Sequence, residues 1–249
     1  MRLLIGIDDT DNKESRGTGY NSRQLATAIE QEKLGRVHGI TRHQLFVHPN
    51  IPYTSQNSSA CLDVTAEGIA KDLIHFCRSY MLQAGAEGSD VGLCIAESDR
   101  ISKDIIRWGE DAKSVVLKVD DASKLARSNH IYLEGLTGTY VGIIGALAAI
   151  GLRSGGNDGR FIWLNSEKNL RDIEQGIHTV QDLMKFSGID VVQPTENEDI
   201  NLKHRVNLNE WARPLLQQNK AVLLVEKTIN NTHYEWKCAT KELVKRISN

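Results

Sequence analysis

The stretch Arg2-Leu-Leu-Ile-Gly-Ile-Asp-Asp-Thr-Asp11 decides how this chain begins to fold. Its first six residues are mostly apolar and end abruptly in acids, the pattern of a buried strand that opens into a loop. Ligand sites of α/β folds lie outside the carboxyl ends of their strands. We therefore expect Asp8, Asp9 and Asp11 to stand together at a sheet edge, where a ligand binds.

These three carboxylates repel one another, which lowers stability unless a cation neutralises them. Hard oxygen ligands of this kind suit Mg²⁺, usually through one or two carboxylates together with substrate phosphates. Asp8, Asp9 and Asp11 are accordingly the predicted metal ligands and catalytic residues. The alternative is an Asx-rich turn whose acids are simply solvated.

A glycine-containing loop, Ser15-Arg-Gly-Thr-Gly19, separates this strand from the first predicted helix. The backbone N–H groups of Gly17 and Gly19 could approach an anion there, with the following helix N-terminus adding a favourable dipole. Arg16 could neutralise phosphate charge. The loop matches neither the Walker A motif nor the Rossmann fingerprint, so a flexible turn stays the alternative.

A second glycine turn precedes the apolar segment 140–152. Gly135, Thr137 and Gly138 could form a second phosphate cradle ahead of a helix. The competing interpretation is close helix packing through Gly138, Gly142 and Gly145. Both interpretations remain open at this stage.

Composition narrows the class of protein. The 249 residues are 40% hydrophobic and 25% charged, with 20 glycines and 4 prolines, which excludes a disordered or collagen-like chain. A formal net charge of −2 gives no global attraction to nucleic acid or anionic lipid. No apolar run approaches the roughly 20 residues that span a bilayer. We expect no membrane partner.

The cysteines and histidines do not have the spacing of metal ligands. Four isolated cysteines without a C-x-x-C pair indicate free thiols in a reducing cytoplasm rather than disulfides or a zinc site. The histidines of the segment 38–48 are expected at the surface or in packing roles. These residues are Cys61, Cys77, Cys94 and Cys238, and His38, His43 and His48.

The linker-like segment 153–160 contains three glycines and places the predicted domain boundary, giving units 1–155 and 156–249. Hydrophobic periodicity predicts alternating strands and helices in both units, and so an α/β (α+β) protein. The expected strands are 2–7, 37–47, 59–65, 91–96, 114–118, 161–164, 191–193, 221–227 and 234–238, the last two forming a hairpin around Asn230-Asn231; the segment 131–133 is brief and apolar. The expected helices are 21–33, 66–84, 101–109, 122–128, one after the second glycine turn, 170–186 and 241–247.

Several motifs, in order along the chain, resemble the archaeal isoleucine-tRNA agmatinylcytidine synthetase family. The opening strand with its acid cluster is the most specific of them. The others are Pro49-Asn-Ile-Pro-Tyr53, Ile144-Gly-Ala-Leu-Ala-Ala-Ile-Gly151, Phe161-Ile-Trp-Leu164 and, more weakly, Ala221-Val-Leu-Leu224.

The resemblance implies an ATP-dependent enzyme with a kinase-like N-terminal domain followed by a ferredoxin-like domain. In that family the aspartates bind ATP and Mg²⁺, a phosphate is transferred to activate a cytidine carbonyl, and agmatine then displaces it. By motif, Asp8, Asp9 and Asp11 would inherit metal and phosphate binding. Thr18 would correspond to a threonine-bearing segment near the γ-phosphate.

The chain also departs from the family pattern. The polar segment 54–59 replaces a basic, glycine-containing one, and the OB-fold and zinc ribbon that grip tRNA are expected to be absent. We therefore carry over the phosphoryl chemistry more firmly than the substrate. Nearby candidates for substrate contacts are Tyr20, Asn57, Arg153, Asn157 and Arg160.

The leading hypothesis is an ATP- and Mg²⁺-dependent phosphotransferase or ligase-like enzyme that acts on a nucleotide, RNA or small-molecule acceptor. One alternative is a non-catalytic nucleotide-binding regulator or subunit. Another is a phosphatase of the D-x-D type, with Asp9 as nucleophile and Asp11 as acid. Lys13 stands where that superfamily prefers Thr or Val, which disfavours the second alternative.

Overall fold

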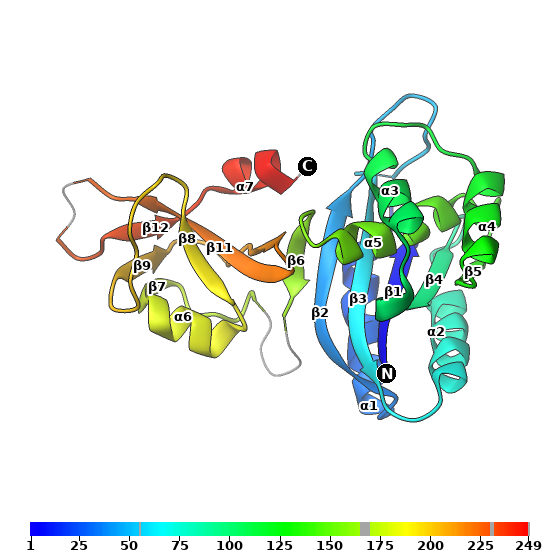
Figure 1. Ribbon diagram of the computed structural model, residues 1–249, viewed down its shortest axis with the longest axis horizontal. Helices are drawn as coiled ribbons and strands as arrows, with labels where there is room; N and C mark the ends of the chain where they lie inside the picture. Colours follow the sequence, from blue (N-terminus) through cyan, green and yellow to red (C-terminus); the bar gives the residue numbers. More distant parts are fainter. Residues whose placement is uncertain (55, 165–169, 230–231, 249) are drawn as a thin grey trace.

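A computed structural model describes residues 1–54, 56–164, 170–229 and 232–248. Two parts lie side by side along the long axis of the molecule, and strand β6 lies between them (Figure 1). Within the described residues, twelve strands form one sheet in the order β5-β4-β1-β3-β2-β6-β10-β11-β12-β9-β7, with β8 pairing to β11. This mixed α/β architecture confirms the predicted fold class.

The N-terminal part is built around β1 (Arg2–Asp8), whose five central residues are buried. It pairs antiparallel with β3 (Ser58–Ala66) on one side and β4 (Gly92–Glu97) on the other. Outside these, β2 (Gly35–Gln44) pairs with β3, and β5 (Tyr132–Gly135) pairs with β4, again antiparallel. The acidic end of β1 is therefore held from both sides.

Helices cover both faces of this half of the sheet (Figure 1). One hydrophobic cluster joins the sheet to two helices, and a second cluster joins the other face to three. The first pair is α1 (Thr18–Gln31) and α2 (Ala70–Ala84); the second group is α3 (Lys103–Asp111), α4 (Val119–Ser128) and α5 (Gly142–Gly155), with the short 3₁₀ turn η1 (Ser98–Arg100) before α3.

Helix α5 lies unusually close to the sheet because glycines face it. A Cβ built at Gly6 would lie 2.0 Å from the carbonyl oxygen of Ala146, and one at Gly92 would lie 2.1 Å from the carbonyl carbon of Gly142. Any larger residue would push the helix away. This contact seats the N-terminus of α5 beside the acidic end of β1.

Strand β6 (Arg160–Trp163) joins the two parts. It pairs antiparallel with β2 of the N-terminal part and with β10 (Leu215–Gln217) of the C-terminal part. Ile162 packs in the N-terminal core, whereas Phe161 packs in the C-terminal core. The predicted boundary at residues 155/156 falls at the end of α5, just before this shared strand.

As far as the structure describes it, the C-terminal part consists of short strands and two helices. Strands β11 and β12 pair antiparallel, as predicted, although the Asn230-Asn231 turn lies outside the described residues. Its elements besides β6 and β10 are β7 (Gly176–Thr179), α6 (Val180–Ser187), β8 (Val191–Pro194), β9 (Arg205–Leu208), β11 (Lys220–Lys227), β12 (Trp236–Cys238) and α7 (Lys241–Ser248). Across the described ranges, no helix is both long and apolar enough to cross a bilayer.

Three local predictions were wrong. The helix expected over 170–186 begins only at Val180, because Gly176 has a positive φ of 131° in β7 and the Thr179 side chain caps the helix by accepting from the Asp182 N–H. The strand expected at 114–118 is irregular backbone. The helix expected from residue 66 starts at Ala70, since β3 continues through Ala66.

Candidate active site

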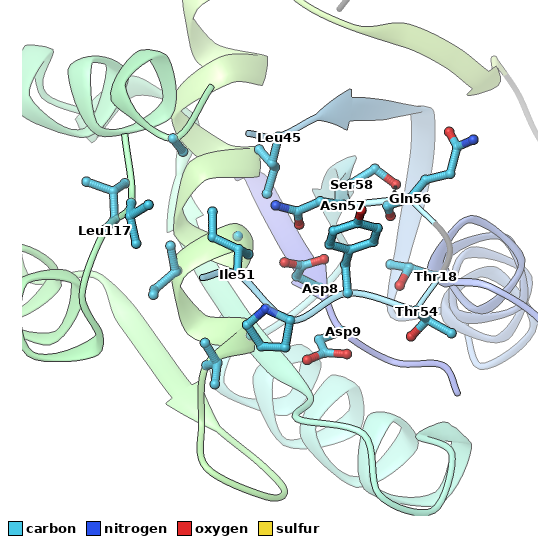
Figure 2. Close-up of a pocket in the computed structure, with 18 of the residues that line it drawn as sticks. Asp8, Asp9, Thr18, Leu45, Ile51, Thr54, Gln56, Asn57, Ser58 and Leu117 are labelled. Atoms are coloured by element: carbon cyan, nitrogen blue, oxygen red, sulfur yellow. Dashed lines mark hydrogen bonds between the residues drawn. The ribbon is translucent and has the colours of Figure 1, made fainter. Parts of the chain in front are cut away.

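A pocket opens at the carboxyl end of β1, between the N-termini of α1 and α5 (Figure 2). Its open volume is about 790 Å³, mouth included. Figure 2 shows Asp8 and Asp9 near its centre, with Ile51 on one side and Thr18 and Thr54 on the other. The lining residues are Asp8, Asp9, Asp11, Thr18, Leu45, Asn50, Ile51, Pro52, Tyr53, Thr54, Gln56, Asn57, Ser58, Ala112, Val115, Val116, Leu117, Val141, Gly142, Ile144 and Gly145.

Asp8 is the last residue of β1 and lies against helix α5. A Cβ at Gly145 would come within 1.8 Å of Asp8 Oδ2, so only glycine leaves room for this carboxylate. Burial, and then the charges of Asp9 and Asp11, raise the pKa of Asp8 to about 8. Without a cation beside it, the carboxyl group is mostly protonated at neutral pH.

Asp9 turns the chain out of the sheet. Its backbone has a φ of 51°, a left-handed conformation that Asp adopts more readily than most residues and that often marks functional sites. Burial, and then the neighbouring charges of Asp90 and Asp11, raise the pKa of Asp9 to about 6. Asp90 is a fourth acid of this region that the sequence patterns did not reveal.

Asp11 anchors the start of helix α1. Its Oδ1 accepts hydrogen bonds from the Thr18 N–H at 3.1 Å and the Thr18 hydroxyl at 3.0 Å. The buried Thr10 hydroxyl lies 3.2 Å from the Thr18 Oγ1 and accepts from Asn21 Nδ2 at 2.8 Å. The carboxylate at the positive end of α1 stabilises the helix and fixes the Thr18 side chain at the pocket wall.

Asp8 and Asp9 can bind a cation only if a ligand or water supplies further oxygens. Within the described residues, no three His, Cys, Asp or Glu side chains are arranged to hold a metal ion by themselves. Asp8 and Asp9 can each supply carboxylate oxygens, and the remaining positions would have to come from phosphate oxygens or water. That donor set is the usual one for Mg²⁺ in phosphate-binding sites.

The opposite wall of the pocket is apolar. Val115 and Val116 are 47% and 41% exposed in the irregular segment after α3, and they face the same pocket as Ile51. A pocket that is acidic at one end and apolar at the other suits a ligand with a charged group and a flat apolar ring.

The glycine loop before α1 supports the helix start instead of lining the pocket. Among the described residues that line it, Arg16, Gly17 and Gly19 are absent. The Arg16 guanidinium lies 5.2 Å from the centre of the Tyr20 ring, and Gly17 is the N-cap of α1. A Cβ at Gly19 would contact Ile162.

The second glycine turn packs around Asp90 and does not line the pocket. Thr137 accepts from the Val91 N–H at 2.9 Å and donates to the Ser89 carbonyl oxygen at 2.6 Å, while a Cβ at Gly138 would collide with the Asp90 carboxylate. Gly135 packs against the Tyr140 ring. None of the three predicted cradle residues lines the pocket in the part of the chain that the structure describes.

The predicted substrate-contact residues separate into different places. Asn57 lines the pocket, and its Nδ2 donates to the Phe46 carbonyl oxygen at 2.6 Å. Arg153 is buried against Asp63, with 2.6 Å between Nη2 and Oδ2. Asn157 accepts from the Gln218 N–H at 2.8 Å, and Arg160 lies in a neighbouring recess.

His43 has a packing role, as predicted, but within a polar network. It is fully buried, and its ring contacts the Thr41 hydroxyl at 2.8 Å and Asp158 Oδ1 at 2.9 Å. Lys113 pairs with the other Asp158 oxygen. This network ties β2 to the residues between α5 and β6.

No protein-family model matches this chain. Its curated relatives include an uncharacterised protein of Methanocaldococcus jannaschii, 29% identical over 152 residues, and the tRNA 2-agmatinylcytidine synthetase TiaS of Archaeoglobus fulgidus, 28% identical over 155 residues. Each match covers 61% of this chain, but only 50% of the first protein and 36% of the second. The chain therefore matches about half or less of these relatives' length.

A solved structure agrees with the sequence matches. The crystal structure of TiaS in complex with tRNA and ATP is similar over 61% of this chain and 36% of that one, with a TM-score of 0.53 and 25% identity. Over that share of its length the chain is homologous to archaeal TiaS in sequence and in structure, which confirms the resemblance seen in its motifs.

Proposed function

We propose that this protein is an ATP- and Mg²⁺-dependent phosphotransferase or ligase-like enzyme, acting on a nucleotide, RNA or small-molecule acceptor. One observation carries the proposal: Asp8 and Asp9 line one pocket together with the N-terminal residues of α1 and α5. The homology to TiaS, whose complex contains ATP, supports the same nucleotide.

The pocket offers the parts that phosphoryl transfer requires. Such reactions depend mainly on positioning and on neutralising phosphate charge. Asp8 and Asp9 would hold Mg²⁺, which when bound supplies that neutralisation. Thr18, whose N–H and hydroxyl both donate to Asp11, fixes the positive end of α1 at the pocket wall near the phosphates, and the apolar wall at Ile51 receives the base.

Deprotonation of Asp8 accompanies binding in this scheme. Because burial and neighbouring acids raise the pKa of Asp8 to about 8, its proton must leave when Mg²⁺ and the nucleotide enter. At Asp9 the backbone is left-handed, and its carboxylate lines the same pocket as that of Asp8. Together these two acids are the residues expected to be essential.

The experiment is a calorimetric titration of the full chain with ATP, with and without Mg²⁺. We expect binding that depends on Mg²⁺ and that weakens at least tenfold in Asp8→Asn and Asp9→Asn. Asn tolerates the left-handed conformation of residue 9, so the second variant should fold. ATP turnover should then be followed with candidate acceptors present.

A matched control is Asp99→Asn, which removes one exposed carboxylate from η1, outside the pocket. It should bind Mg²⁺-ATP like the wild type. Full binding and turnover in folded Asp8→Asn and Asp9→Asn would refute the proposal. Tight binding without turnover on any acceptor would favour a non-catalytic nucleotide-binding regulator instead.

A further inference from the structure

A second recess lies beside the candidate active site and shares two residues with it, Tyr53 and Gln56. It is formed by the end of β2, the start of β6 and helix α7. Its lining residues are Arg42, Gln44, Val47, Tyr53, Gln56, Arg160, Lys245 and Ser248. Three of these side chains are cationic and none is acidic.

Two of the cations face each other across the sheet. Arg42 of β2 and Arg160 of β6 are directly paired residues of neighbouring antiparallel strands. Side chains at such positions point to the same face, where two like charges destabilise the sheet. The fold therefore places a repulsive pair at this point of the junction.

The repulsion is not relieved by acids. None of the ion pairs among the described residues involves Arg42, Arg160 or Lys245. The Arg160 Nε and Nη1 atoms are buried without a hydrogen-bond partner, and Arg42 Nη2 donates only to the amide oxygen of Gln56, at 3.2 Å. Buried donors of this kind normally have partners.

Nearby Arg213 adds to the positive charge but is already engaged. Its Nη2 lies 2.7 Å from Glu210 Oε2, and its guanidinium stacks on Trp211. Burial, and then the charges of Arg42 and Arg213, lower the pKa of Arg160 to about 10. Arg42 and Arg160 of the recess thus have no acidic partner among the described residues, and an anion would supply one.

We propose that this recess binds the phosphate group of a small phosphorylated acceptor, next to the nucleotide in the candidate active site. Planar guanidinium groups match phosphate oxygens through paired hydrogen bonds, and a dianion neutralises the repelling arginines. Three cations line this recess, whereas the chain as a whole has a net charge of −2, which favours one phosphate group over a long polyanion. The inference deepens the proposed function, since it names the acceptor class for that site.

The test uses the full chain in Mg²⁺-free buffer, titrated calorimetrically with ribose 5-phosphate, a simple phosphate monoester, and with inorganic phosphate. Arg160→Met and Arg42→Gln should each weaken binding at least tenfold, the loss expected for a charged hydrogen bond. Arg36→Gln, an exposed arginine of the same strand β2, is the matched control and should bind like the wild type.

A second readout separates binding from folding. Without ligand, Arg160→Met should melt at the same temperature as the wild type or higher, because it removes one of two repelling charges. With phosphate present, only the wild type and Arg36→Gln should gain melting temperature. Unchanged phosphate binding in both folded variants overturns the inference, as does Arg160-dependent binding of a short single-stranded RNA with no binding of the monoester.

Asp9→Asn distinguishes this inference from the proposed function. It should lose Mg²⁺-ATP binding and keep ribose 5-phosphate binding. If the wild type binds the monoester through Arg160 but never Mg²⁺-ATP, the proposed function fails and the anion site stands. If it binds Mg²⁺-ATP but not the monoester, the anion site fails alone. Stronger binding of inorganic phosphate than of the monoester would assign the recess to free phosphate and contradict the acceptor class.

Discussion

The space for the Asp8 carboxylate is provided by Gly145: a Cβ at residue 145 would lie 1.8 Å from Asp8 Oδ2. A residue in α5 thus decides where the end of β1 can place its charge, although the two are far apart in the sequence. The glycine pattern of α5 therefore serves the site as well as the packing.

Gly145→Ala should damage both stability and binding. The added methyl group must displace Asp8 or α5, at about 1–3 kcal/mol of unfolding free energy. Chemical denaturation and Mg²⁺-ATP titration would measure the two effects. Gly155→Ala on the same helix is the control, because its Cβ would meet only Ile106, at 3.5 Å. Equal behaviour of the two variants would contradict this account.

The titration of Asp8 should make the stability of the metal-free protein depend on pH. Its pKa is raised from the ordinary value to about 8 in the folded state, so the folded protein holds this proton more tightly than the unfolded chain. The contribution is complete below about pH 4 and is lost as pH rises through 8. Asp8→Asn should therefore exceed the wild type in stability at pH 8 by several kcal/mol, as urea denaturation would show. A wild type that is more stable than Asp8→Asn at pH 8 would contradict the shift.

His43 should make stability change with pH in the opposite direction. Burial lowers its pKa below the ordinary 6.5, despite the hydrogen bond to Asp158, so the unfolded chain takes up the proton first. The contribution of His43 to stability is complete above the ordinary pKa of 6.5 and is lost as the pH falls below it. His43→Gln should remove this part of the acid slope, whereas His75→Gln, exposed on α2, should leave it. Thermal melts between pH 5 and 8 measure the difference, and identical slopes in the wild type and His43→Gln would exclude the effect.

Base recognition by the apolar wall can be separated from phosphate binding. Ile51→Ala should weaken ATP binding by about three- to tenfold, since roughly 1 kcal/mol accompanies the lost apolar contact. Binding of inorganic triphosphate with Mg²⁺ should not change. Ile69→Ala, which is 68% exposed before α2, is the matched control. Equal losses for ATP and triphosphate would place the base elsewhere.

The local pattern of the first eleven residues predicted the buried strand and the acids at its end, because both depend only on neighbouring residues. Asp90 and Gly145 were not identified as parts of the same region. Their proximity to Asp8 and Asp9 arises from the position of β1 beside β4 and from the close approach of α5. Neither of these long-range contacts can be predicted from the pattern of a short segment.

The sequence pattern gave a wrong prediction where apolar residues are exposed. The segment 114–118 has the composition of a strand, yet Val115 and Val116 lie on an irregular segment at the wall of the pocket. The helix expected over 170–186 similarly ignored the stop at Gly176 and the cap at Thr179. Tertiary contacts and a single backbone conformation outweighed hydrophobic pattern in these places.

Strand β6 has a mechanical consequence. It is hydrogen-bonded to β2 on one edge, while on the other the Phe161 N–H donates to the Pro214 carbonyl oxygen and Leu216 donates to Gly159. The two halves of the molecule are consequently parts of one continuous ladder and not bodies on a flexible tether. Any motion that carries α7 toward the candidate active site must twist that ladder, and so must shift Arg42 and Arg160 together.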